Sequence, residues 1–314
     1  MRKAQFLQEL AQVLSSSCLF LTKAGKDEFL AELFLIQKNG FMFDDMPTYA
    51  EITAKTAQVL AEENNIPLTV DYEDTELETE AIAYYRIKGM IMGESSWWFS
   101  TKQFVNDVTA AEENPRIISH FMHVNSGGGD TWYLDVAWQT LMKAKKPVIV
   151  LVERVGGSAA VYLFSPSKSI YAATQNDILG SIGVMVSFYD WDSYFETLGL
   201  KVIEEYATKS DLKNKKFNDL KDGKPKQFRE EELDPLRNQF EEAVRTARKK
   251  TNELPADHPL FRGETFHTEQ AIGLGLIDGQ KNLREALADA YAQGQNYLGK
   301  TRSHKTAFNY LNNN

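Results

Sequence analysis

The stretch PVIVLVERVGGSAAVYLF, residues 147–164, decides the fold expected for this chain. Its first seven residues, 147–153, form a nearly continuous apolar run, which is typical of a strand buried on both faces of a parallel sheet. The two glycines that follow favour a tight turn, and the small and apolar residues after Ser158 favour a helix. The stretch therefore predicts a strand that turns through glycines into a helix, with a serine at the helix start.

The same alternation of strands and helices continues on both sides of this stretch. Strands are expected at 81–92, 116–124 and 169–173, and helices at 100–115 and 131–146. An order of this kind is typical of an α/β core with a largely parallel sheet and flanking helices.

The outer parts of the chain have different patterns. Residues 1 to about 65 favour helices, with Ile52, Val59 and Leu60 on one face, and an acidic stretch at 71–80 has no core pattern. A lysine-rich segment at 201–226 favours a loop with an embedded strand, and 227–254 a long amphipathic helix around Pro235. We expect three parts, namely a helical N-terminal extension with an acidic linker at 1–80, a core domain at 81–295 and a frayed polar tail at 296–314.

The composition narrows the function classes. The 314 residues carry 44 acidic and 35 basic side chains, a net charge of -9, which argues against non-specific nucleic-acid binding. No apolar run reaches the roughly 18 residues of a membrane span. One cysteine, Cys18, rules out an intrachain disulfide and cysteine-rich zinc sites. We therefore expect neither a metal nor a cofactor, and any histidine mechanism must use one of His120, His123, His258, His267 and His304.

A second glycine turn, NSGGGD, occupies residues 125–130 between a predicted strand and a predicted helix. Consecutive glycines let the backbone approach a ligand closely, and outward-pointing amides bind anions or a developing oxyanion. The spacing matches neither a G-x-G-x-x-G dinucleotide site nor a phosphate loop ending in G-K-[ST]. A flexible connection between strand and helix explains the turn equally well.

Ser158 has two interpretations. A serine at a helix start is often an N-cap whose hydroxyl accepts a bond from a backbone amide. The same arrangement also exposes a nucleophile beside helix-start amides, although no G-x-S-x-G motif of an ordinary α/β-hydrolase is present. Both glycine turns are expected at the carboxyl ends of neighbouring strands, where open α/β sheets bind ligands, and this pairing favours the nucleophile.

The ordered motifs VNSGGGD, VGGSAAVYLFSPSKSIYAATQND, LGSIGV and AIGLGLIDG resemble the signal peptide peptidase A-like serine peptidases. The resemblance spans roughly residues 80–290. It implies a Clp/crotonase fold and a serine peptidase with a Ser-Lys dyad, which requires no catalytic histidine. Family members form rings or domes in which neighbouring subunits complete the site, so a homo-oligomer that cleaves polypeptides is expected.

The resemblance also implies roles for single residues. Ser158 matches the family nucleophile, with Ala159 and Ala160 where the family has glycines. Gly128 matches the first glycine of the family oxyanion turn and Gly127 replaces its proline, so the amides of Gly128 and Ala159 are expected to hold the oxyanion. Supporting positions are Gly127, Gly129 and Ser181 of the LGSIGV turn.

The family base is a lysine about 50–60 residues beyond the serine, which falls in the lysine-rich segment. Lys209, followed by Ser210 and Asp211, fits best, although the family glycine before it is missing. The alternatives are Lys213, then Lys215 and Lys216. A lysine is protonated at neutral pH, so the base must be buried enough to lower its pKa.

Three further functions stay open. A crotonase-like acyl-CoA enzyme would use the same amide turns, and a structural or scaffolding subunit with a decayed site would keep only the fold. Within the peptidases, the lack of a membrane anchor favours phage or prophage capsid maturation, with capsid or scaffold partners and a location in the host cytoplasm or at a procapsid, over membrane signal-peptide processing.

Overall fold

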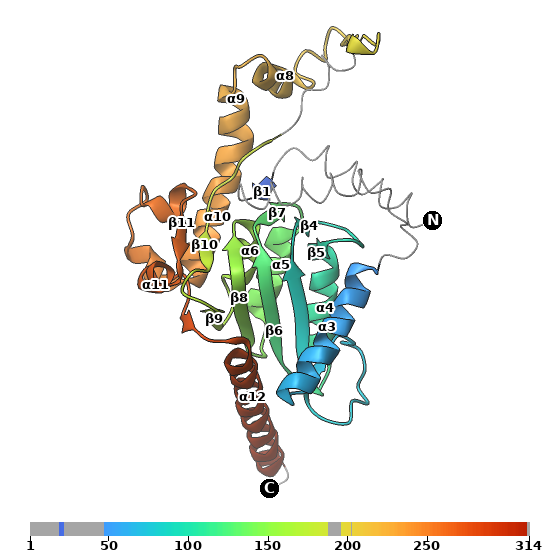
Figure 1. Ribbon diagram of the computed structural model, residues 1–314, viewed down its shortest axis with the longest axis vertical. Coiled ribbons are helices and arrows are strands. Elements are labelled where there is room, and N and C mark those ends of the chain that lie inside the picture. The colour runs from blue at the N-terminus through green and yellow to red at the C-terminus, as the bar shows by residue number, and fades with distance from the viewer. Residues whose placement is uncertain (1–18, 22–46, 188–195, 202, 313–314) are drawn as a thin grey trace.

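The computed structural model describes residues 19–21, 47–187, 196–201 and 203–312 (Figure 1). Its central sheet has the strand order β11-β10-β8-β6-β3-β2, with β9 and β12 added beside β8. All pairs in this sheet are parallel except β10 with β11. The predicted α/β class with a largely parallel sheet is confirmed. The strands are β2 (Leu68–Thr69), β3 (Ala81–Lys88), β6 (Ile117–Ser126), β8 (Val148–Gly157), β9 (Ser169–Ala172), β10 (Ile178–Gly180), β11 (Thr265–His267) and β12 (Gly279–Gln280).

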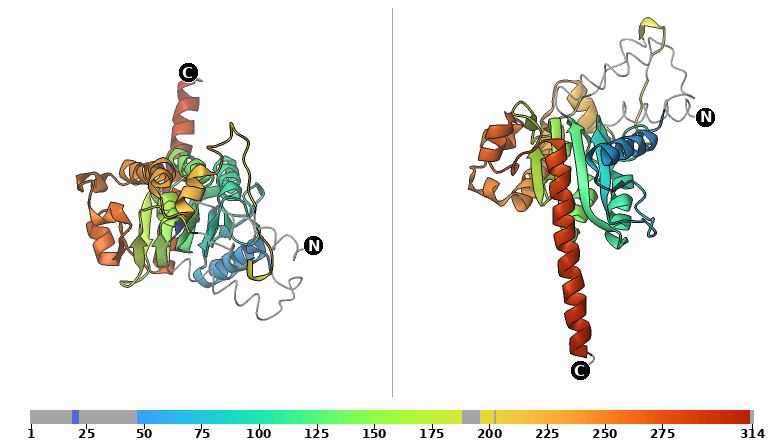
Figure 2. Two further views of the ribbon diagram at one scale, coloured as in Figure 1. Left: turned by 90° about the horizontal axis from the view of Figure 1, so that it is seen from above. Right: turned by 60° about the horizontal axis from the view of Figure 1, so that its bottom comes forward.

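Helices cover both faces of this sheet (Figures 1 and 2). Successive strand residues point to opposite faces. Tyr85 and Val150 face the side of α4 (Thr101–Glu113), α5 (Leu134–Lys143) and α6 (Ala159–Phe164), whereas Tyr84 and Leu151 face α3 (Tyr49–Asn64) and α12 (Leu283–Asn312). Burial on both faces explains why residues 147–153 are apolar without alternation.

A second, small sheet lies above the carboxyl ends of the central strands. It has the order β1-β7-β4-β5, built from β1 (Leu19–Leu21), β7 (Gly128–Asp130), β4 (Ile91–Met92) and β5 (Phe99–Ser100). The prediction that a helix directly follows the glycines at 127–129 is wrong, because β7 intervenes and α5 begins only at Leu134. Pairing of β7 with strands far away in the sequence overrides the local turn pattern.

The N-terminal part joins the same body. Helix α3 begins with a capping box between Thr48 and Glu51, and its buried side chains are those of Thr53, Ala57 and Leu60. Val59, predicted on the buried face, is 42% exposed. Strand β2 precedes the boundary expected near residue 80 and pairs with β3. The helical prediction is wrong for the strand Leu19–Leu21, and the remainder of residues 1–46 lies outside the described residues.

Residues 196–201 and 203–228 form an arm that projects from the carboxyl end of the sheet (Figure 1). No strand occurs in the described part of 201–226, so the predicted embedded strand is wrong, and α8 (Lys215–Lys221) stands there instead. The long helix expected at 227–254 is confirmed as α9 (Lys226–Phe228), a π-helical turn (Arg229–Leu233) and α10 (Asp234–Ala247), with Pro235 in the first turn of α10. Helix α11 (Thr268–Gly273) follows β11.

Helix α12 runs on to Asn312 and extends away from the body (Figure 2), so the predicted frayed tail after residue 300 is wrong for the backbone up to that residue. Gly294 lets the helix lie close to the sheet, since a Cβ there would come within 2.7 Å of the Ile118 side chain. A search of the described helices finds none with the length and apolar character that crossing a membrane requires.

Candidate active site

Ser158 sits at the elbow between β8 and α6. Its backbone has φ 55° and ψ -119°, a conformation that costs a residue with a side chain about 1–3 kcal/mol. The Ser158 N–H donates to the carbonyl of Gly180 at 2.8 Å, which holds the elbow against the end of β10. The predicted order of strand, serine and helix is confirmed, but the predicted glycine turn is wrong, because Gly156 and Gly157 are the last residues of β8 and pair with β10, and the chain turns at Ser158 itself.

The Ser158 hydroxyl has no hydrogen-bond partner in the part of the chain that the structure describes, although the residue is only 1% exposed. It does not cap α6, because no backbone amide of that helix donates to it. The N-cap interpretation is therefore wrong. Buried hydroxyls are normally satisfied, so this strained and unbonded group needs another explanation than packing.

The glycine turn of residues 127–129 lies next to this elbow. Ser126 pairs with Gly156 at the end of β8 after a shift in register, and β7 contacts α6. Gly129 has no space for a side chain, because a Cβ would lie 1.9 Å from the carbonyl oxygen of Ile91. The predicted Ser158, Ala159, Gly127, Gly128 and Gly129 thus gather at one end of the sheet.

One of the two predicted oxyanion amides is already engaged. The N–H of Gly128, which has φ 106°, donates to the Ser126 hydroxyl at 3.1 Å, and that hydroxyl donates to the carbonyl of Gly89 at 2.6 Å. Ser126 was not singled out from the sequence. Its place directly before three glycines was the available signal, since a short hydroxyl side chain can bond the backbone two residues on.

Ser181 follows Gly180, whose carbonyl binds the Ser158 amide. Both residues have positive φ, 120° for Gly180 and 55° for Ser181, and the Ser181 N–H donates to the carbonyl of Glu264 at 2.7 Å. The LGSIGV turn therefore passes beside the elbow as its small residues predict, and it is fixed there by the segment before β11.

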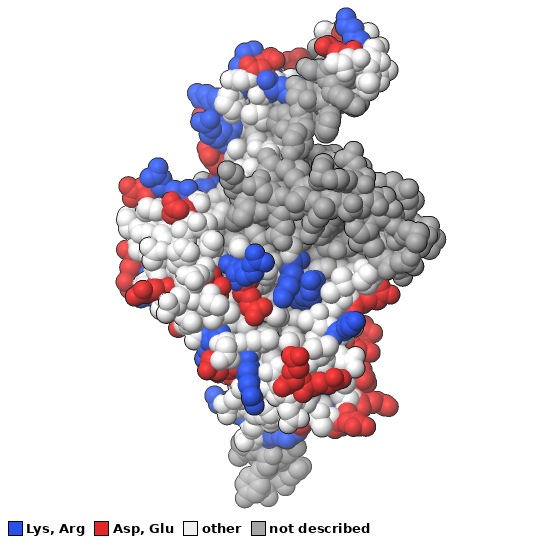
Figure 3. All heavy atoms as spheres, in the orientation of Figure 1, with Lys and Arg blue, Asp and Glu red and all other residues white. Residues whose placement is uncertain are grey.

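The structure does not bring a lysine of the arm to Ser158 within one chain. Lys209 is exposed and has neither a hydrogen bond nor an ion pair with another described side chain, and Lys213 is also exposed. Lys215 pairs with Asp219. Lys216 pairs with Glu232, and this bond raises the pKa of Lys216, which opposes a role as base. These lysines contribute to the basic side chains along the arm at the top of Figure 3.

Two lysines elsewhere have pKa values lowered by burial. Burial lowers the pKa of Lys146 to about 8, but Lys146 precedes β8 and is separated from Ser158 by the strand's length, about 30 Å. Its Nζ donates to the carbonyls of Ala111 and Asn114, both at 2.6 Å. Lys88 is half-buried and lies 3.8 Å from Glu153. Neither bonds to Ser158.

His120 and His123, which lie on β6 of the central sheet, each hydrogen-bond to a tyrosine and a glutamate. His123 bonds to the Tyr84 hydroxyl at 3.0 Å and to Glu153 at 2.6 Å, as expected for a packing or supporting role. His120 makes the equivalent bonds to Tyr85 and Glu112 on the other face. Burial lowers the pKa of both imidazoles. Neither His123 nor His120 bonds to Ser158, and among the residues that can be described no His, Cys, Asp and Glu side chains gather as a metal site.

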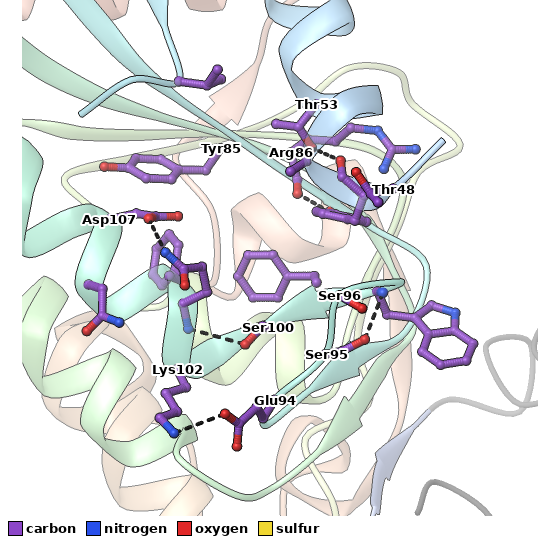
Figure 4. Close-up of a pocket in the computed structure, with 18 of the residues that line it drawn as sticks. Thr48, Thr53, Tyr85, Arg86, Glu94, Ser95, Ser96, Ser100, Lys102 and Asp107 are labelled. Carbon is purple, nitrogen blue, oxygen red and sulfur yellow. Dashed lines mark hydrogen bonds and ion pairs between the residues drawn. The ribbon is translucent and has the colours of Figure 1, made fainter. Parts of the chain in front are cut away.

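A cavity of about 870 Å³ lies away from Ser158, between α3, α4 and the loop from β4 to β5 (Figure 4). Aromatic side chains, among them Tyr49, Tyr85 and Phe104, line it. Asp107 faces it and accepts a bond from Gln103 at 2.8 Å, and burial raises the pKa of Asp107 to about 6. The strained and unbonded serine at the elbow, away from this cavity, marks the candidate site.

Comparison with solved structures gives distant similarities. A lysine-to-alanine mutant of the 1510-N membrane-bound stomatin-specific protease, in complex with a substrate peptide, is 14% identical over 68% of this chain and 81% of that chain, with a TM-score of 0.40. A serine-to-alanine mutant of the same protease is 15% identical over 66% and 83%, with a TM-score of 0.42. A protein assigned as an enoyl-CoA hydratase/carnithine racemase from Magnetospirillum magneticum AMB-1 is 16% identical over 73% and 77%, with a TM-score of 0.40.

A search of curated protein sequences finds no significant match. The family model of peptidase family S49 matches residues 140–296, which is half of the chain. The match runs from α5 to α12 and includes the Ser158 elbow, the LGSIGV turn and the arm. It confirms the predicted resemblance to the signal peptide peptidase A-like enzymes and supports serine peptidase activity. The chain belongs to peptidase family S49.

Proposed function

We propose that the protein is a serine endopeptidase in which Ser158 attacks the scissile carbonyl and a lysine of the arm, Lys209 by preference, accepts the hydroxyl proton and returns it to the leaving amine. The observation that carries this proposal is the Ser158 hydroxyl, which is buried, unbonded and held at a strained strand-to-helix elbow. A nucleophile of this kind needs a base from outside its own helix.

A second copy of the chain supplies the lysine in this proposal. The arm carries apolar side chains in open solvent, with Leu198 and Leu200 each 58% exposed, Ile203 78% and Leu212 73%. Exposed apolar side chains grouped in this way are typical of an interface. Docking of the arm on a neighbouring subunit would cover them and would desolvate Lys209, which lowers the pKa of a lysine toward the value a base needs.

The amides of Ala159 and Gly128 stabilise the oxyanion in this mechanism. The Gly128 N–H must then exchange the Ser126 hydroxyl for the substrate oxygen, and Ser126 keeps its own bond to Gly89. Gly127 and Gly129 keep the turn free of side chains, and Ser181 orients the lysine from the turn next to the elbow.

For the physiological substrates we propose capsid or scaffold polypeptides of a phage or prophage, cleaved in the host cytoplasm or at a procapsid. The support for this context is the resemblance to the capsid-assembly branch. Incubation with purified procapsid proteins and mapping of the new termini tests it, and intact partners in the presence of active enzyme would exclude it.

Hydrolysis of casein or of a peptide library by wild type and Ser158→Ala tests the nucleophile. We expect the variant to lose at least about 10³-fold in activity. Ser119→Ala is the matched control, because Ser119 is also fully buried and unbonded among the described residues but lies within β6. Equal activity in Ser158→Ala and wild type would exclude Ser158 as nucleophile, and no activity in any of the three proteins would favour the decayed scaffold.

Subunit mixing tests the shared site. Ser158→Ala and Lys209→Ala are each expected to be inactive alone, and random mixed assembly should restore about a quarter of wild-type activity, because one site in four receives both intact groups. Full activity in Lys209→Ala would show that the base is Lys213 or another residue. Inactive mixtures of subunits that do exchange would place serine and lysine in the same chain.

A further inference from the structure

The N-terminal strand β1 lies on the glycine turn of the site. Its three residues pair antiparallel with β7, with Leu19 opposite Asp130, Phe20 opposite Gly129 and Leu21 opposite Gly128. The two strands are more than 100 residues apart in the sequence and lie side by side at the carboxyl end of the sheet (Figure 1). The residue opposite Leu21 is the one assigned to the oxyanion.

The other edge of β7 is already taken. Ile91 of β4 pairs with Gly129, and the contact is so close that a Cβ on Gly129 would overlap the Ile91 carbonyl. Strand β7 is thus fixed from the β4 side, and β1 holds the one edge left for a further strand.

An extended peptide binds a protease or a peptide-binding domain by adding a strand to such an edge. We propose that Leu19–Leu21 occupy the substrate-strand position of their own chain, so that the N-terminal segment is a built-in competitor with an apolar extended sequence, and that substrates must displace it. The inference rests on the proposed function of the Ser158 site.

The strand Leu19–Leu21 is held by few hydrogen bonds, so a substrate can displace it. A backbone hydrogen bond contributes a net 0.5–1.5 kcal/mol, so a three-residue strand is held weakly. Tethering compensates, because a segment of the same chain competes intramolecularly and needs no second molecule. The segment therefore suppresses binding of short or weak peptides and yields to substrates that make additional contacts along the groove.

Hydrogen exchange on the full chain tests the pairing without any chemistry, because Ser158→Ala serves as background. Phe20→Pro removes a donor N–H from the centre of β1, whereas Phe20→Val keeps the N–H and the strand propensity. We expect exchange of at least one of the amides at 129 and 130 to speed up at least tenfold in Phe20→Pro and that of both to stay unchanged in Phe20→Val, since the Gly128 N–H is held by Ser126 in either variant. Equal exchange in both variants would overturn the pairing.

Binding of a fluorescent peptide that contains Leu-Phe-Leu tests the competition in the same background. We expect the Kd to fall at least tenfold in Phe20→Pro relative to Phe20→Val, and an unchanged Kd would overturn the proposal. Both readouts are independent of turnover. If β1 proves irrelevant while Ser158→Ala still abolishes hydrolysis of casein, only this inference fails, and if Ser158→Ala leaves hydrolysis intact, the proposed function fails instead.

Discussion

The two ends of β8 bury polar groups in opposite ways. At the amino end, Lys146 is 6% exposed and its ammonium donates to two carbonyls near the end of α4. At the carboxyl end, Ser158 is 1% exposed and its hydroxyl has no partner among the described residues. A satisfied buried group stabilises the fold, whereas an unsatisfied one costs free energy and persists where chemistry needs it. The difference supports our proposal that the carboxyl end of the strand carries the reactive group, while the amino end stabilises the fold.

Removing the buried ammonium at the amino end of β8 is the strongest test of this comparison. Lys146→Met leaves two buried carbonyls unpaired and should lower the free energy of unfolding by about 2–3 kcal/mol. Activity per folded molecule should stay within about threefold of wild type, because the site lies at the far end of β8. Urea unfolding followed by circular dichroism, together with peptide hydrolysis, measures both quantities. A large loss of activity without a loss of stability would contradict the assignment.

Asp107 in the large cavity is an intermediate case, a carboxylate with a single bond to Gln103. Burial raises the pKa of Asp107 to about 6, so the folded state binds the proton more tightly than the unfolded chain does. Its ionised form therefore destabilises the protein at neutral pH, and this cost disappears as the pH falls from about 6 toward 4. Asp107→Asn should raise the free energy of unfolding by about 1 kcal/mol at pH 7.5, after allowance for solvent screening, and give no gain at pH 4.

Chemical unfolding at the two pH values measures this difference. A gain of the same size at pH 4 and pH 7.5 would show that Asp107 does not carry a raised pKa in the folded protein.

Ser119 provides a second buried hydroxyl to compare with that of Ser158, with the smallest expected effect. Its hydroxyl is as buried and unbonded among the described residues as that of Ser158, but it lies within β6, beside a register shift in the pairing with β3, and its backbone has no positive φ. Ser119→Ala should raise the free energy of unfolding by up to about 1 kcal/mol and leave hydrolysis unchanged. Thermal unfolding detects the gain. A loss of stability would show that the Ser119 hydroxyl has a partner after all.

Local pattern was sufficient for the part of the chain that carries the elbow. The apolar run at 147–153 and the small residues after Ser158 predict β8 and α6, and the structure has both, although the glycines extend β8 instead of forming the turn. The two interpretations of Ser158 could not be separated from the sequence, because an N-cap and an exposed nucleophile need the same residue at the same place. Only the backbone angles and the missing bond distinguish them.

Predictions failed where contacts distant in sequence decide the structure. Residues 128–130 become a strand because β4 and β1 pair with them, and no local signal contains either partner. The same holds for Leu19–Leu21, whose surroundings favour a helix by periodicity. Helix α8 replaces the predicted strand in the arm, where no residue of α8 is buried and packing therefore fixes neither choice. The position of the lysine that completes the site depends on a second chain in our proposal, and no pattern within one chain specifies it.

Covalent labelling tests the central claim, that Ser158 is the nucleophile, most directly. The full-length wild-type protein is treated with a peptidyl phosphonate, which bonds to an activated serine oxygen, and the adduct is located by mass spectrometry of a proteolytic digest. We expect one adduct, on Ser158, and none in Ser158→Ala. An adduct on another serine would contradict the claim. Inhibition of casein hydrolysis by the phosphonate without an adduct on Ser158 would contradict it as well.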